Sequence, residues 1–254
     1  MRRILGTAII AALSVATALA GDLTITFKNG GKHNEGISHQ YMTADRHRTN
    51  HEGTQIDSMM DLQKGMIYTI KHKDKKVEFM SFDDMEKVAE AMSARMAEMQ
   101  AQMKEGPMAE MMAKMMGDPN NFSVDQVGSE TVAGRKCTKY HMVMMKMDMT
   151  LSADPNLKLP MNPANFARFT KFTHLMQFAA SPAAAKMATE MAKIKGFTLK
   201  SVTVAPFIGE ITREATEVKE GPIPASVFAL PEGYKMEDAG KKMLEQAQKG
   251  SRKR

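Results

Sequence analysis

Short runs of alternating apolar and polar residues dominate the first part of this sequence. Residues 22–28 place Leu23, Ile25 and Phe27 on one side of an extended chain, which is the period-two pattern of a half-buried strand. Strand-like runs recur near 37–43, 45–50, 55–60, 66–72 and 76–80, with turn-like segments between them. Such closely spaced runs predict an antiparallel meander of short strands.

The period changes at residue 81, where Ser81 and Asp84 resemble a capping box at the start of a helix. A stripe of apolar residues then recurs at helical spacing: Met85, Val88, Met92, Met96, Met99 and Met103. A Gly-Pro pair at 106–107 breaks this helix, and a second short one carries Met108, Met111, Met112, Met115 and Met116. We therefore predict helical insertions at about 82–117 and, after a Pro-rich link, at about 164–195.

Strand patterns return at 122–127 and about 136–152, and again at 197–204 and 208–219. We interpret 136–152 as one strand, with these residues on one face: His141, Val143, Met145, Met147, Met149 and Leu151. The order of strands, helices, strands, helices and strands predicts an α+β fold. One antiparallel sheet with helices packed on a face is the simplest arrangement.

The first 20 residues predict export. Arg2 and Arg3 precede an apolar stretch that ends in Ala18-Leu19-Ala20, the three parts of a cleavable signal peptide. We expect cleavage after Ala20 and a periplasmic protein. The mature chain is expected to form a single domain over 21–236, followed by a polar, basic tail over 237–254. No later segment is apolar for long enough to cross a membrane.

Composition argues against nucleic acid as a partner and leaves one outlier. The formal charge is +6, and the absence of Trp together with only 4 Tyr argues against nucleic acid. The lone Cys137 allows no internal disulfide, and we expect it to be a small buried residue. The 27 Met residues are the outlier that any function must explain.

Three segments resemble a known family: MDLQKGMIYTI at 60–70, GRKCTKY at 134–140 and EVKEGPIPASVFALPEGYK at 217–235. They are similar to a family of exported bacterial proteins of unknown function that itself resembles the LolA/LolB lipoprotein-sorting carriers. The resemblance implies a half-barrel, in which helices cover the concave side of a curved antiparallel sheet. In the carriers that side holds lipoprotein acyl chains. We expect residues 224–234 to be structural, with a turn and a Tyr that holds the segment in place.

The first functional hypothesis is a protein that binds a lipid or acyl chain. A concave sheet covered by helices makes an apolar pocket, and Met side chains adapt to flexible ligands. The candidate residues are Met85, Met92, Met96, Met99 and Met103 on the helix, and Val143, Met145, Met147 and Met149 on the strand. The simpler alternative is that these residues fill the core between helix and sheet.

Two other functions remain open. Thioethers are soft ligands that select Cu(I), and the spacing of Met92, Met96 and Met99, and of Met111, Met112 and Met115, could bring three sulfur atoms together. Alternatively, the Met-rich helices form a docking face for another envelope protein.

Nothing in the sequence points to catalysis. It contains no nucleophile elbow, zinc-protease motif, phosphate loop or paired Cys residues, so we expect no enzymatic activity and no cofactor. His47 and His51 lie four residues apart without an evident third ligand, and we expect them to be solvated.

Overall fold

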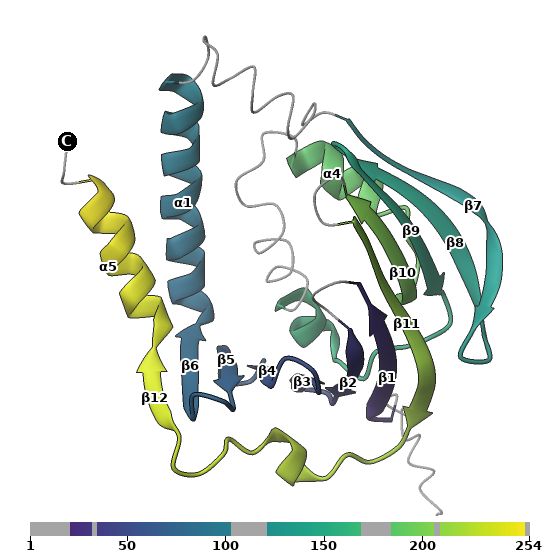
Figure 1. Cartoon of the computed structure of the whole chain (residues 1–254), viewed down its shortest axis with the longest axis horizontal. Helices are drawn as coiled ribbons and strands as arrows, with labels where there is room; N and C mark the ends of the chain where they lie inside the picture. Colours follow the sequence, from purple (N-terminus) through teal and green to yellow (C-terminus); the bar gives the residue numbers. More distant parts are fainter. Residues whose placement is uncertain (1–20, 32–34, 103–120, 169–183, 206–208, 252–254) are drawn as a thin grey trace, which may run out of the picture.

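The computed structural model describes residues 21–31, 35–102, 121–168, 184–205 and 209–251. A 12-stranded sheet runs through these ranges in the order β12-β6-β5-β4-β3-β2-β1-β11-β10-β9-β8-β7. Neighbouring strands are antiparallel except β12 and β6, which run parallel. The sheet curves strongly and does not close, because β12 and β7 remain as separate edges (Figure 1). The predicted curved antiparallel sheet is therefore confirmed.

The elements follow one another along the chain with short connections. The strands before the first helix are β1 (Leu23–Gly30), β2 (Gly36–Met42), β3 (Arg46–His51), β4 (Ile56–Asp61), β5 (Met66–Lys71) and β6 (Lys76–Ser81). The later strands are β7 (Phe122–Val132), β8 (Arg135–Met144), β9 (Met147–Asp154), β10 (Phe197–Ala205), β11 (Gly209–Glu220) and β12 (Lys235–Asp238). The helices are α1 (Phe82–Gln102), α4 (Ala184–Met191), the 3-10 turn η1 (Ala225–Phe228) and α5 (Ala239–Ser251).

Helix α1 begins where the capping box predicted. The Ser81 hydroxyl accepts the Asp84 backbone N–H at 3.0 Å and donates to the Asp84 carboxylate at 2.7 Å. The helix packs against α5 and β6, and Gly240 of α5 makes this possible, because a Cβ there would lie 3.0 Å from the Cβ of Asp84. Figure 1 shows α1 and α5 side by side at one end of the sheet. Residues 103–117 of the expected insertion lie outside the described residues.

The prediction of one strand over 136–152 is wrong. β8 ends at Met144 and β9 begins at Met147, and the two pair as an antiparallel hairpin. Met145 occupies the turn with a φ of 56°, a left-handed conformation that single residues adopt in tight turns. An uninterrupted apolar pattern hid this turn, because neither Gly, Pro nor Asn marks it.

The second expected insertion is helical at 163–168 and again in α4, while 169–183 lie outside the described residues. Helix α4 covers part of the edge strand β7. The Glu190 carboxylate accepts the Val124 N–H at 2.8 Å, and Lys193 donates to the Val124 carbonyl at 3.3 Å. These bonds occupy backbone groups that a sheet edge would otherwise offer to another strand. None of the described helices has the length and hydropathy of a membrane span.

Candidate functional site

Strand register divides the sheet into two faces. We call the face that carries Leu23, Ile25 and Phe27 of β1 the inner face, and the opposite one the outer face. Met187 of α4 packs with Tyr140 on the inner face, and Figure 1 shows α4 inside the curve of the sheet. The inner face is therefore the concave one, where the predicted ligand would bind.

Methionines occupy two parts of the inner face, which we call its arms: one is formed by β4–β6 and the other by β8 and β9. On one arm, register aligns Met60 of β4, Ile67 of β5 and Met80 of β6 in a single row. On the other arm, a second group of methionines comes from β8 and β9: Met142, Met144, Met147 and Met149. Met80, Met144, Met147 and Met149 are half-buried. The two arms lie on opposite sides of the curve (Figure 1).

The structure separates the residues that the sequence grouped. Met147 and Met149 lie on the inner face, and Met149 packs with the cluster beneath α4. Val143 points to the outer face, because it pairs with Asp148 rather than with Met147, and Met145 sits in the turn. Met85 is buried near the start of α1, directly after β6, and β6 lies far from β9 in the strand order. The side chains of Met92, Met96 and Met99, together with Met103, Met111, Met112 and Met115, lie outside the described residues.

The centre of the inner face is polar. Asn29 of β1 is buried and donates to the Ser38 hydroxyl at 2.9 Å and to the Gly36 carbonyl at 3.2 Å. His47 of β3 lies on the same face in another row, where it pairs with Met42 of β2 and Met60 of β4. Burial, together with the positive charge of Arg213, lowers the pKa of His47 to about 4. His47 is half-buried, and not fully solvated as expected, and with this pKa its imidazole is neutral at pH 7.

Arg213 lies between the two arms. On β11 it pairs with Asn29 of β1 and Ser201 of β10, and its guanidinium carbon lies 3.6 Å from the centroid of the Phe27 ring. Burial lowers the pKa of Arg213 to about 10. Sequence reasoning missed this residue, although an Arg between Ile211 and Ala215, on the more apolar face of the strand, was a visible signal.

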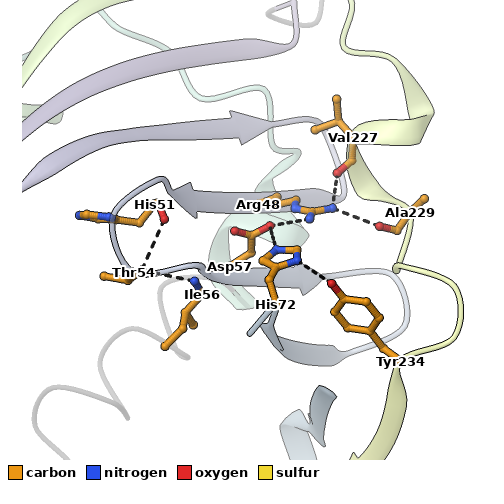
Figure 2. A network of polar contacts seen from close by, with 9 residues as sticks. All are labelled: Arg48, His51, Thr54, Ile56, Asp57, His72, Val227, Ala229 and Tyr234. Carbon is orange, nitrogen blue, oxygen red and sulfur yellow. Dashed lines mark hydrogen bonds and ion pairs between the residues drawn. The ribbon is translucent and has the colours of Figure 1, made fainter. Parts of the chain in front are cut away.

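A different polar network lies on the outer face (Figure 2). Arg48 donates to Asp57 at 2.6 Å and to the carbonyls of Val227 and Ala229 at 2.6 and 3.1 Å. His72 contacts Asp57 at 3.0 Å through Nε2, and its Nδ1 lies 3.1 Å from the Tyr234 hydroxyl. These bonds hold residues 221–234, which we call the C-terminal strap, against the sheet.

The strap also packs through apolar side chains. Phe228, Val227, Leu230 and Tyr234 join a cluster with Met59, Tyr68, Ile70 and Val77 of the outer face. The structural role expected for 224–234 and its Tyr is thus confirmed. The chain then returns to the sheet as β12, so the sheet continues past residue 236 and leads directly into α5.

A pocket of about 400 Å³ opens on the outer face between β1, β10 and β11. Alternation directs Lys28, Lys200, Thr212 and Glu214 toward it. Lys200 is already balanced by Glu130 at 3.4 Å and by Glu214 at 3.2 Å. Arg213 also borders this pocket, but its guanidinium stacks on Phe27 of the inner face.

The Cu(I) hypothesis depends on methionine side chains that lie outside the described residues, so only other kinds of metal ligand can be assessed. The described residues contain no group of three His, Cys, Asp or Glu side chains able to hold an ion. Cys137 is buried as expected, and burial raises the pKa of its thiol, so it is not poised as a thiolate ligand.

Comparisons with known proteins identify a family and a set of distant structures. The model of a family described as Domain of unknown function (DUF4412) matches residues 21–234. No curated protein sequence gives a significant match. The expected resemblance to a family of unknown function is confirmed.

The structural matches are remote. MucB of Pseudomonas aeruginosa, in complex with MucA, is 12% identical with a TM-score of 0.39, and the match covers 83% of this chain and 56% of MucB. An uncharacterized conserved protein from Thermus thermophilus is 9% identical with a TM-score of 0.45, covering 87% and 91% of the two chains. A LolA superfamily protein from Nitrosomonas europaea is 4% identical with a TM-score of 0.27, covering 83% and 90%. The chain thus spans little more than half of MucB.

Proposed function

The chain belongs to the family described as Domain of unknown function (DUF4412), and we propose that it is an exported, non-enzymatic binding protein of the cell envelope. Its ligand in this proposal is a lipid or acyl chain, held on the inner face. We further propose that the Met-rich insertion expected at about 82–117 covers that face.

One observation supports this proposal above the others: methionines line both arms of an open, curved sheet. Met60 and Met80 lie on one arm and Met144, Met147 and Met149 on the other. Unbranched thioether side chains change rotamer at low cost and remain polarizable, so they fit apolar chains of variable shape. Because the sheet does not close, its arms can enclose a ligand without breaking strand pairing.

The proposed location rests on the first 20 residues. A basic start, an apolar stretch and an Ala-Leu-Ala end predict cleavage after Ala20. Release into the periplasm would place the protein where lipids need carriers between membranes.

Native mass spectrometry of protein recovered from the periplasm without detergent tests the proposal. We expect a chain that starts at Gly21 and carries the added mass of a lipid, which is lost on solvent extraction. A bare polypeptide that also fails to bind a fluorescent fatty acid would contradict the proposal. Mass increments of copper would favour the metal hypothesis instead.

Matched variants place the ligand on the inner face. Replacing Met80 and Met147 together with Gln removes apolar surface from both arms, and should weaken fatty-acid binding about tenfold or more. Met236→Gln is the control, because Met236 is 48% exposed and its register partner Val77 lies on the outer face. Equal loss in both proteins would contradict an inner-face site.

A further inference from the structure

Among the described residues, two arginines stack on phenylalanine rings, and one of the two has a carboxylate nearby. Arg46 lies 4.9 Å from the Phe228 ring on the outer face and 3.7 Å from Asp45. Arg213 lies 3.6 Å from the Phe27 ring on the inner face. Within the described part of the chain, no hydrogen bond or ion pair satisfies the Arg213 guanidinium.

An unpaired guanidinium in this position is costly. Arg213 is half-buried, so its charged form is partly shielded from water, and this burial lowers its pKa. Desolvated charges in proteins are normally paired or hydrogen-bonded, and the ring face of Phe27 returns only part of the lost hydration. Five N–H donors in a planar fork therefore remain available to an acceptor from outside the chain.

The surroundings of Arg213 on the inner face contain no competing anion among the described residues. Asn29 beside it is committed to Ser38 and Gly36, and His47 is neutral because its pKa is about 4. Glu214, the next residue on β11, faces the opposite side of the sheet with Lys200. The centre of the inner face thus carries one net positive charge.

The position of Arg213 in the sheet suits the head group of an amphiphile. β11 lies in the middle of the strand order, between the arm of β4–β6 and the arm of β8–β9. A polar, positive centre flanked by methionine-lined arms suits a molecule with an anionic head and apolar chains. A planar guanidinium fork binds carboxylate and phosphate oxygens in the same way.

We propose that Arg213, stacked on Phe27, binds the oxyanion of an amphiphilic ligand, either a carboxylate or a phosphate. This inference rests on the proposed function and extends it, because it specifies that the lipid is anionic and where its head lies. Arg213 recognises the head, and the methionines of the two arms contact the chain.

Comparing laurate with dodecanol tests the inference on the unmodified protein. The two ligands share an alkyl chain and differ in the anionic head. We expect laurate to bind roughly 10- to 100-fold more tightly by calorimetry, as charge-assisted hydrogen bonds imply. Arg213→Gln should reduce laurate to the affinity of dodecanol and leave dodecanol unchanged. Arg46→Gln, which removes the other stacked arginine, should leave both affinities unchanged.

The outcomes separate the two proposals. Equal binding of laurate and dodecanol to the unmodified protein would overturn the oxyanion site while supporting the apolar-ligand function. Failure of both ligands to bind would overturn the function. Binding of inorganic phosphate alone, lost in Arg213→Gln, would support the oxyanion site as one for a free anion and overturn the acyl-chain function. Because the laurate comparison needs no variant, it stands even where Arg213→Gln fails to fold.

Discussion

Arg48 and Arg213 occupy opposite faces of the same sheet and differ in every polar contact. The Arg48 side chain is 11% exposed and binds one carboxylate and two backbone carbonyls. Arg213 has an aromatic ring beneath it and no acceptor among the described residues. The two terminal nitrogens of Arg48 join the sheet to the strap, whereas its Nε has no partner among the described residues. An arginine without any such bond contributes little to the fold. The outer face therefore carries a structural network, and the inner face carries an arginine that makes no hydrogen bond or ion pair with the described residues.

The largest effect should come from breaking the outer network. Asp57→Asn removes the charge that pairs with both Arg48 and His72, and leaves a buried guanidinium uncompensated. We expect the free energy of unfolding to fall by about 3–5 kcal/mol in urea titrations. Glu217→Gln is the control, because its exposed pair with Lys219 should contribute less than about 1 kcal/mol. A loss below that level for Asp57→Asn would show that the strap is held by its apolar side chains alone.

A pH titration probes the neutral histidine of the inner face. The pKa of His47 is about 4 in the folded protein and near 6.5 in the unfolded chain, so only the unfolded state gains this proton between those values. Stability must then fall as the pH drops from 6.5 toward 4, by roughly 3 kcal/mol from this group.

The variant His47→Gln isolates this contribution, because carboxylates that titrate in the same range are common to both proteins. As the pH falls from 7 to 4.5, we expect the free energy of unfolding to fall further in the wild type than in the variant. A difference that stays constant over this range would mean that His47 titrates normally.

A smaller loss is expected where the strap meets the sheet. Tyr234→Phe removes the hydroxyl that contacts His72 Nδ1 at 3.1 Å, and should lower the free energy of unfolding by about 1 kcal/mol. Tyr41→Phe provides the match, because Tyr41 packs against the same cluster and its hydroxyl has no hydrogen-bond partner in the described ranges. Equal changes in the two variants would show that the Tyr234 hydroxyl adds no stability through its contact with His72.

The sequence predicted local structure well and long-range placement poorly. Alternation and turn residues located the strands before residue 81, and Ser81 with Asp84 located the start of α1. Both signals act between residues close in the chain. The hairpin at Met145 was missed because its turn uses a left-handed Met, without the Gly or Asn that usually mark such turns.

The candidate site shows the same limit. Pairing of β1 with β11 joins residues almost 200 positions apart and brings Phe27 under Arg213. No periodicity within either strand encodes that contact, so the polar centre of the inner face emerges only from the assembled sheet. The methionine stripes, in contrast, were visible locally, and Met147 and Met149 do lie on the inner face.

The smallest predicted effect returns to the unpaired arginine. Arg213→Met keeps an unbranched stem against the Phe27 ring and removes a desolvated charge. If Arg213 serves a ligand rather than the fold, the ligand-free variant should unfold with an unchanged or higher free energy, by up to about 1 kcal/mol. Thermal and urea unfolding of delipidated protein would measure this change in the free energy of unfolding. Arg48→Met is the comparison, and its free energy of unfolding should fall by several times ~1 kcal/mol. A loss above about 1 kcal/mol for Arg213→Met would make its stacking on Phe27 structural, and the contrast between the two faces would then disappear. Retained stability together with lost laurate binding would show that Arg213 serves the ligand and not the fold.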